Sequence, residues 1–289
     1  MKKKKYSYMN RRNFKIFLTA VIVLLILAAV VLTYSYSNRN YDIEAESKEY
    51  EKIEKAQKKA EKETRQAIRA REKAKSTTYS FLQGPKSYEG GYDWAGEWCN
   101  ININGNKFGA FGCGLCCIAN IYSTISPYEC SPKDAFKYAK KASNYSPTSV
   151  AGAIDWKDMK KTLKKMGFTC SIETKPATLE EFEKKVSGAQ CAIALVSSNN
   201  DDTYWEDTPG HYVTIWLYDE TEEQVFLTDS GSPARNRNDI PCEYVYDALK
   251  TSGDYQVLYV WSYNEDENKW KSDGIDEVWN VPSVEQQVQ

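Results

Sequence analysis

The sequence predicts an α+β fold, in which a domain of helices followed by an antiparallel sheet is preceded by a transmembrane helix and a helical stalk. Three observations support this prediction. Helical patterns fall between residues 113 and 186 and strand patterns between 190 and 263, and helices followed by strands are typical of α+β domains. An apolar run occupies residues 16–32, and residues 44–75 are charged and contain no Gly or Pro.

Residues 1–37 are expected to form a basic cytoplasmic tail and a single transmembrane helix. Residues 16–32 are apolar except for Thr19, which is close to the ~20 residues that cross a bilayer. Seven Lys or Arg and no acid precede this run, so the N-terminus is expected in the cytoplasm and the later domain outside the cell membrane. The alternative is a cleaved signal peptide, but the run exceeds the usual apolar region of about 7–15 residues.

Residues 38–76 are expected to form a charged helical stalk. Glu, Lys, Arg and Ala dominate this stretch, and all four favour helix. The positions that would form a coiled-coil seam are mostly alanine, as at Ala56, Ala60 and Ala67. Such a seam buries little surface, so oligomerisation through the stalk is only weakly supported.

The distribution of charge excludes one class of partner. The formal net charge of −2 combines +7 for residues 1–37, +3 for residues 38–75 and −12 for the remainder. Nucleic-acid binding demands a basic surface, so an acidic domain argues against such a partner. The same charge favours neutral or cationic peptides.

The folded domain is predicted to span residues 77–263, with an irregular acidic tail at 264–289. Residues 77–110 look like an irregular lead-in rich in Gly, Tyr, Trp and Asn. Ser131-Pro132 and Thr178 are signals for the start of a helix, and Gly167 is a signal for its end. The expected helices are 113–124, 132–142, 155–166 and 178–186, and the expected strands are 168–173, 190–196, 211–218, 224–228 and 255–263.

Cys113 is the candidate nucleophile. It stands between Gly112 and Gly114 at the beginning of an apolar, helical run. The positive end of a helix dipole favours a thiolate over a thiol, and flanking glycines allow backbone and substrate to approach closely. A cysteine in this position is therefore suited to nucleophilic catalysis.

His211 and Asp229 are the candidate partners of Cys113. His211 is the only histidine of the chain and opens an apolar strand, whereas Asp229 ends the next strand. A hairpin would bring both to the same end of the sheet, where the carboxylate could orient the imidazole. Cysteine, histidine and carboxylate are the parts of a thiol hydrolase, so the sequence predicts a cysteine peptidase or amidase.

Such an enzyme also needs donors for the oxyanion. The backbone N–H of Cys113 is one, and a side-chain amide usually supplies another. Gln83, Asn104 and Asn106 lie upstream and are the candidates. The residues alone leave the choice among them open.

A resemblance to a known family bears on that choice. Phe81-Leu82-Gln83-Gly84-Pro85, Gly112-Cys113-Gly114-Leu115, Gly210-His211-Tyr212-Val213 and Leu227-Thr228-Asp229 resemble the Gln, Cys, His and Asp segments of bacteriocin-processing (double-glycine leader) peptidase-like domains, members of the papain-like superfamily. The resemblance covers about residues 80–263. It implies a papain-like cysteine peptidase fold, a triad of Cys113, His211 and Asp229, and Gln83 as the oxyanion residue. Stand-alone, membrane-anchored relatives occur in Gram-positive bacteria, which is similar to the layout expected here.

Three other interpretations use the same residues. Cys113 and Cys116 form a C-x-x-C pair, as in thiol–disulfide oxidoreductases, but no βαβ unit surrounds it. A zinc site from Cys113, Cys116, Cys117 and His211 is disfavoured because no second C-x-x-C supports it. The third is an inactive surface binding module. We therefore expect no metal or cofactor, a peptide, protein or peptidoglycan-peptide substrate, and undetermined disulfides among the other cysteines.

Overall fold

The computed structural model describes residues 23–27, 30, 43–148 and 151–282. The chain divides into two compact units, residues 1–69 and 70–289. Helix α2 (Ile43–Thr77) begins in the first unit and ends in the second. Within the first, its exposed turns carry ion pairs four residues apart, such as Glu51–Lys55 and Glu61–Arg65, which favour an isolated helix.

The predicted membrane span at residues 16–32 falls mostly on positions outside the described residues. Among the helices that are described, none combines the length and the apolar character required to cross a membrane.

The second unit is built on a six-stranded sheet in which every neighbouring pair is antiparallel. The strand order is β3-β8-β4-β5-β6-β7. The prediction of an α+β domain with an antiparallel sheet is therefore confirmed. The strands are β3 (Met166–Glu173), β4 (Cys191–Val196), β5 (His211–Asp219), β6 (Gln224–Thr228), β7 (Asn238–Pro241) and β8 (Val257–Asn268).

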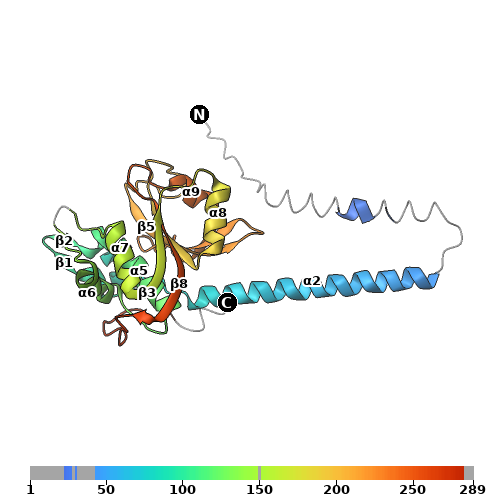
Figure 1. The fold of residues 1–289 in the computed structure, drawn as a ribbon, viewed down its shortest axis with the longest axis horizontal. Helices are drawn as coiled ribbons and strands as arrows, with labels where there is room; N and C mark the ends of the chain where they lie inside the picture. The colour runs from blue at the N-terminus through green and yellow to red at the C-terminus, as the bar shows by residue number, and fades with distance from the viewer. Residues whose placement is uncertain (1–22, 28–29, 31–42, 149–150, 283–289) are drawn as a thin grey trace. The chain divides into compact units, whose positions relative to one another are not determined.

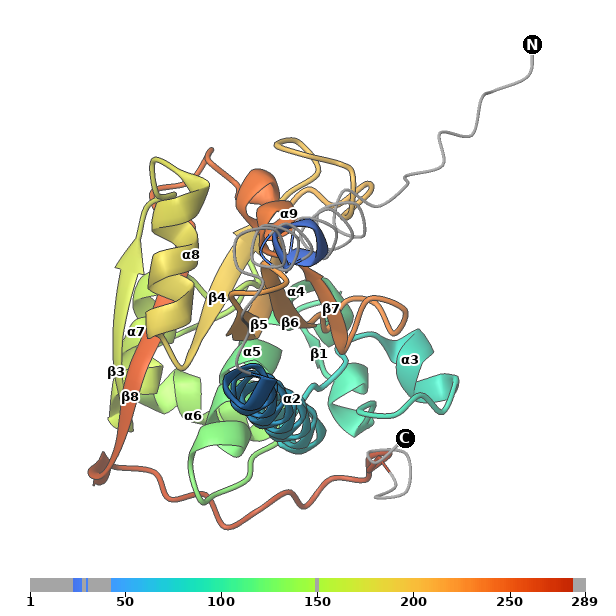
Figure 2. The same ribbon diagram turned by 90° about the vertical axis from the view of Figure 1, so that its right-hand side faces the viewer.

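Helices cover both faces of this sheet (Figure 1). One face packs against a core that includes Leu115, Ile118 and Phe168, and the opposite face packs against a core that includes Phe182 and Val245. The helices of the first face are α5 (Cys113–Ile125), α6 (Pro132–Ser143) and α7 (Trp156–Lys165), and those of the second are α8 (Leu179–Gly188) and α9 (Cys242–Ala248). Figure 2 shows the same layers from another side.

The side chains of β5 explain why this strand is central. Tyr212 and Trp216 belong to the core beneath α5, whereas Val213 and Ile215 belong to the core beneath α8. Successive side chains of a strand point to opposite faces, so a strand covered on both sides is apolar throughout. The largely apolar character of the strand after His211, broken by the buried Thr214, reflects this double burial.

The long elements predicted from the sequence are present, within a few residues at their ends. Ser131 and Asp134 form a reciprocal capping box at the start of α6. Thr178 caps α8 by accepting from the Glu181 N–H, but the Glu181 carboxylate bonds Ala177 instead of Thr178. Each helix thus begins where its cap satisfies N–H groups that have no partner inside the helix.

Short elements were not predicted. The lead-in contains α3 (Pro85–Glu89), η1 (Glu97–Asn100), β1 (Asn102–Ile103), β2 (Asn106–Lys107) and α4 (Phe108–Phe111), while β7 and α9 follow the loop after Asp229. Elements of two to seven residues carry little periodicity and are stabilised by tertiary contacts. For example, Trp98 of η1 is fully buried, and its indole N–H donates to the Leu82 carbonyl over 2.6 Å.

The segment after residue 263, expected as an irregular tail, contributes to the structure. β8 continues to Asn268, and Trp279 forms a bridge with Gly96. The Trp279 ring packs against Phe81 and Trp94 at centroid distances of 5.3 and 5.8 Å. This segment therefore covers the beginning of the domain, close in sequence to Gln83.

Candidate active site

Cys113 is the first residue of α5, and its position follows from its immediate neighbours. Gly112 precedes the helix, and a Cβ there would lie 2.2 Å from the Phe108 ring. A Cβ on Gly114 would lie 2.6 Å from the Ile154 side chain and 3.3 Å from the Tyr212 ring. Both glycines are therefore required by close packing, which draws the start of α5 against β5.

His211 and Asp229 lie at one end of the sheet. β5 begins with His211, and its antiparallel neighbour β6 ends at Thr228, directly before Asp229. The register pairs Thr214 with Thr228, so the segment between His211 and Asp229, which are eighteen positions apart, folds back as a hairpin. The imidazole Nε2–H donates to Asp229 Oδ1 over 2.8 Å.

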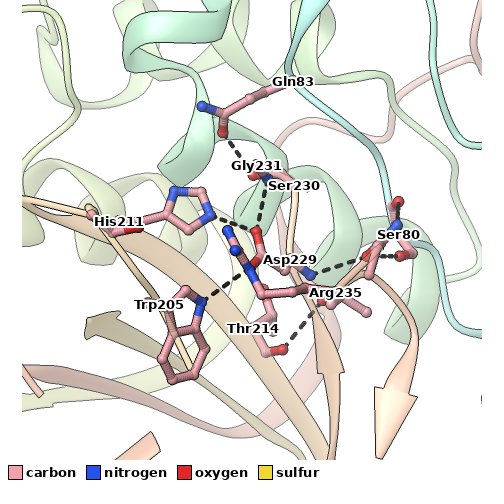
Figure 3. Close-up of polar contacts among 12 residues, drawn as sticks. Ser80, Gln83, Trp205, His211, Thr214, Asp229, Ser230, Gly231 and Arg235 are labelled. Carbon is pink, nitrogen blue, oxygen red and sulfur yellow. Dashed lines mark hydrogen bonds and ion pairs between the residues drawn. The ribbon is translucent and has the colours of Figure 1, made fainter. Parts of the chain in front are cut away.

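The Asp229 carboxylate is fully buried and has several donors. Oδ1 accepts from His211 and from the Gly231 backbone N–H at 2.8 Å. Oδ2 accepts from Trp205 Nε1 at 3.1 Å and from Arg235 Nε at 2.8 Å. Figure 3 shows these side chains converging on the carboxylate. Burial opposes the charged form of Asp229, but the charges and hydrogen bonds of His211 and Arg235 hold its pKa far below the usual range.

The Cys113 thiol and the His211 imidazole are coupled. Burial alone would raise the pKa of the thiol, but the hydrogen bond and charge of His211, with bonds from the Tyr212 and Gly114 backbone, lower it. Burial likewise opposes the imidazolium, but the Asp229 and Cys113 charges raise the pKa of His211 to about 10. Both directions favour a thiolate–imidazolium pair at neutral pH.

Access distinguishes the members of this set. Cys113 and His211 are each 7% exposed, whereas Asp229 is 0% exposed. Cys113 and His211 are therefore the members of this set that keep some exposure, and Asp229 contacts the exterior only through other groups such as His211.

The neighbouring cysteines differ from Cys113. All eight cysteines lie within the described residues, and all eight are free thiols. Burial and the adjacent thiols raise the pKa of Cys116 well above its ordinary value, and burial raises the pKa of Cys117. A rapid dithiol exchange needs a thiolate, so these two favour the protonated, inert form.

The described residues contain no cluster of three or more His, Cys, Asp or Glu side chains that could hold a metal ion. Within these residues, the arrangement around Cys113 offers acid–base and nucleophilic groups. It does not offer a ligand set of the type that zinc prefers.

Gln83 is held beside this set by the loop that carries Asp229. The Ser230 hydroxyl donates to Gln83 Oε1 over 2.7 Å, and the Gln83 backbone N–H donates to the Ser230 carbonyl over 2.8 Å. Gln83 Nε2 donates to the Gly109 carbonyl over 2.9 Å. The side chain is buried, and its orientation is determined because Oε1 can only accept and Nε2 can only donate.

The other two amide candidates lie elsewhere. Asn104 is exposed in the turn between β1 and β2, with a φ of +52°. Asn106 Nδ2 donates to the Thr148 carbonyl over 3.2 Å. The contacts described for Gln83 join it to the Asp229 loop, and the contact described for Asn106 joins it to Thr148.

Sequence reasoning missed three side chains of this site. Trp205 and Arg235 hold Asp229, and Asn236 accepts from the Asp229 backbone N–H over 3.0 Å while donating to the Ser80 carbonyl. Two signals were available: a tryptophan in a polar loop just before His211, and arginines close to Asp229 in an otherwise acidic domain. Buried aromatics and buried cations need a specific reason to be there.

Comparisons with known proteins give little beyond this geometry. No family model matches the chain, and no curated protein matches its sequence. Among solved structures, the chain is similar to the peptidase domain of Streptococcus ComA, a bi-functional ABC transporter involved in a quorum-sensing pathway. The match has 13% sequence identity, covers 53% of this chain and 92% of that chain, and has a TM-score of 0.36. A similarity of this size does not establish a function, which must be argued from the site.

Proposed function

We propose that this chain is a cysteine peptidase or amidase in which Cys113 is the nucleophile, His211 the acid–base and Asp229 the residue that orients His211. The observation that carries the proposal is the buried 2.8 Å hydrogen bond between the only histidine and Asp229, together with a cysteine at a helix N-terminus whose pKa is lowered by His211. This combination activates a thiol and orients an imidazole at the same time.

The reaction follows from these roles. The Cys113 thiolate forms a C–S bond with the substrate carbonyl, and the C–N bond breaks as His211 gives its proton to the leaving amine. Water then attacks the thioester while His211 takes a proton from it, and loss of the C–S bond restores the thiolate. The Cys113 backbone N–H and the second Nε2–H of Gln83, beyond the one bonded to Gly109, are proposed to stabilise the oxyanion.

The test is cleavage of a mixed peptide library by the full-length chain, analysed by mass spectrometry. Cys113→Ala should abolish cleavage because the nucleophile is lost. Cys116→Ala is the matched control, because it removes a buried thiol three residues along the same helix and should leave cleavage largely intact. Loss of cleavage in the control, together with retained cleavage in Cys113→Ala, would overturn the assignment.

Two of the other interpretations, the thiol–disulfide oxidoreductase and the inactive binding module, predict different results. A thiol–disulfide oxidoreductase would reduce insulin disulfides and would yield a Cys113–Cys116 disulfide on oxidation. An inactive binding module would neither cleave peptides nor label rapidly at Cys113 with iodoacetamide. Under the peptidase proposal, Cys113 is alkylated faster than the other seven cysteines at mildly acidic pH.

The location of the enzyme is a separate proposal that rests on the sequence pattern of residues 1–37. We propose a membrane-anchored enzyme whose catalytic domain is extracytoplasmic, acting on peptides, proteins or peptidoglycan peptides there. Cell fractionation and digestion of intact cells with an added protease test this proposal. Recovery in the soluble fraction, or protection of the domain in intact cells, would contradict it.

A further inference from the structure

The charges around Asp229 do not balance with the three proposed catalytic residues alone. A Cys113 thiolate, a His211 imidazolium and an Asp229 carboxylate together carry one net negative charge in a buried site. Uncompensated buried charge is costly. Among the described residues, the recorded ion pairs of Asp229 are with His211 and Arg235, both at 2.8 Å. Arg235 therefore brings the set to neutrality.

Arg235 is also placed to act on Asp229 without touching substrate. Its Nε–H bonds Oδ2, the oxygen that His211 does not use. Trp205 Nε1 shares that oxygen, and the Trp205 ring is fully buried. The carboxylate is therefore fixed from one side by Arg235 and Trp205, which directs Oδ1 towards His211 (Figure 3).

We propose that Arg235 is a positioning residue of the active site, whose guanidinium both orients the Asp229 carboxylate and neutralises the charge that Asp229 adds to the Cys113–His211 pair. This inference rests on the proposed function, since it assigns a role within that same site. It goes beyond the triad because the net charge of the site then depends on a fourth residue, Arg235.

The role matters most after the acyl-enzyme has formed. The thiolate charge is then consumed in the C–S bond, and His211 has given its proton to the leaving amine. The neutral imidazole must next take a proton from water. An unbalanced Asp229 would stabilise the imidazolium and keep His211 protonated by solvent, which would block this step. Arg235 reduces that effect by neutralising Asp229.

Other titratable groups near the site do not mask this effect. Cys116 and Cys117 on α5, Tyr212 on β5, Tyr204 in the β4–β5 loop and Tyr145 after α6 face the set. Burial raises the pKa of every one of these five groups, so each stays neutral at physiological pH. Charged groups around them include Asp155 and Asp158 at the start of α7, which act on Tyr212 and Tyr145, and Lys250, which bonds the Pro209 carbonyl near the start of β5.

The test uses His211 itself as the probe. Because it is the only histidine, ¹³C-histidine labelling of the tag-free, full-length chain gives a single imidazole signal whose NMR titration reports its pKa. Cys113 is first alkylated with iodoacetamide, which makes the sulfur neutral as in the acyl-enzyme. Arg235→Gln removes a positive charge and should raise the pKa of His211 by about one unit or more.

Matched variants separate charge from structure. Arg235→Lys keeps the charge and should return the His211 titration towards that of the wild type. Lys250→Gln removes a charge near the start of β5, where Lys250 bonds the Pro209 carbonyl but not Asp229, and should leave the titration unchanged. Trp205→Phe removes a neutral donor and should give a smaller shift than Arg235→Gln.

The outcomes distinguish this inference from the proposed function. If Cys113 of the wild type labels no faster than the other cysteines, the proposed function fails and the inference fails with it. If Cys113 labels rapidly but His211 titrates identically in the wild type and folded Arg235→Gln, only the inference is overturned. Circular dichroism establishes folding, and an unfolded Arg235→Gln leaves the decision to Arg235→Lys and Trp205→Phe. A shift of the His211 titration in Arg235→Lys as large as that in Trp205→Phe, or larger, would refute a role for charge, because Arg235→Lys keeps the positive charge.

Discussion

The start of α5 and the loop after β6 supply opposite halves of the same site, and they are built differently. At the start of α5, residues adjacent in sequence create the environment of Cys113: Gly112, Gly114 and the first turn of the helix. In the loop after β6, Asp229 depends on groups brought from far along the chain, including Trp205 and, through Ser230, Gln83. The placement of Cys113 at a helix start is therefore determined by its neighbours in the sequence, whereas the environment of the Asp229 carboxylate depends largely on tertiary contacts.

This difference has a consequence for tolerance to mutation. A change beside Cys113 acts mainly through packing, because the glycines there touch apolar side chains such as Phe108 and Ile154. A change in the Asp229 loop acts mainly through charge and hydrogen bonds. Stability measurements should therefore be most sensitive to the first region, and activity to the second.

The largest expected effect comes from removing the negative charge of Asp229. Asp229→Asn keeps the size of the side chain but no longer accepts on both oxygens or stabilises an imidazolium, so peptide cleavage should fall by about 10³–10⁴-fold. The measurement is the initial rate on the peptide that the wild type cleaves best. Asp239→Asn is the control, since Asp239 is paired with Arg71 and Lys75 rather than with His211. An equal loss of rate in both variants would contradict the comparison.

A pair of glycine substitutions sharpens the contrast. The Cβ of Gly114→Ala would meet Ile154 at 2.6 Å and should lower the free energy of unfolding by about 1–3 kcal/mol. The Cβ of Gly231→Ala would lie 3.0 Å from His211 Cε1 and Nε2, so it should disturb the imidazole and reduce activity more than stability. Thermal unfolding and cleavage rate are measured on both.

Gly253→Ala is the control for this pair, because its Cβ would make only an ordinary contact of 3.8 Å. It should change neither quantity. The opposite pattern would contradict this contrast: Gly231→Ala would then lower the free energy of unfolding more than Gly114→Ala does, and Gly114→Ala would lower the cleavage rate more than Gly231→Ala does.

The smallest expected effect is a change in how stability depends on pH. His211 has a raised pKa, so its contribution is present below about pH 6.5 and is lost as pH rises towards about 10. Cys113 has a lowered pKa, so its contribution grows as pH rises towards the unfolded value of about 8.5. Between about pH 6.5 and 8.5 the unfolded imidazole and thiol are both neutral, so the more completely the folded pair exists as thiolate and imidazolium, the more nearly the two effects cancel.

Cys113→Ser removes one side of this cancellation. The variant should lose stability as pH rises through that window, with a slope of up to about 1.4 kcal/mol per pH unit, whereas the wild type should change little. Chemical denaturation at several pH values measures the slope. Parallel profiles for the two proteins would mean that the thiol and the imidazole are not coupled.

Much of this architecture could be predicted from the sequence. The long helices and strands have caps, glycine stops and apolar patterns that depend on neighbouring residues, and they are present in the structure. The neighbouring residues also identify Cys113 as a candidate, because its flanking glycines and the start of a helix can be recognised in the sequence around it. The order of Cys113, His211 and Asp229 was likewise readable, since a hairpin returns residues at its two ends to one edge of a sheet.

What only the tertiary structure decided is the environment of the carboxylate. Arg235 and Trp205 are separated from each other by thirty residues, and no local period relates them to Asp229. They meet there because the β4–β5 and β6–β7 loops lie at the same end of the sheet, and because a buried carboxylate must find donors for both oxygens. Hydrophobic and hydrogen-bonding patterns along the chain determine elements, but the balance of buried charge depends on which loops come together.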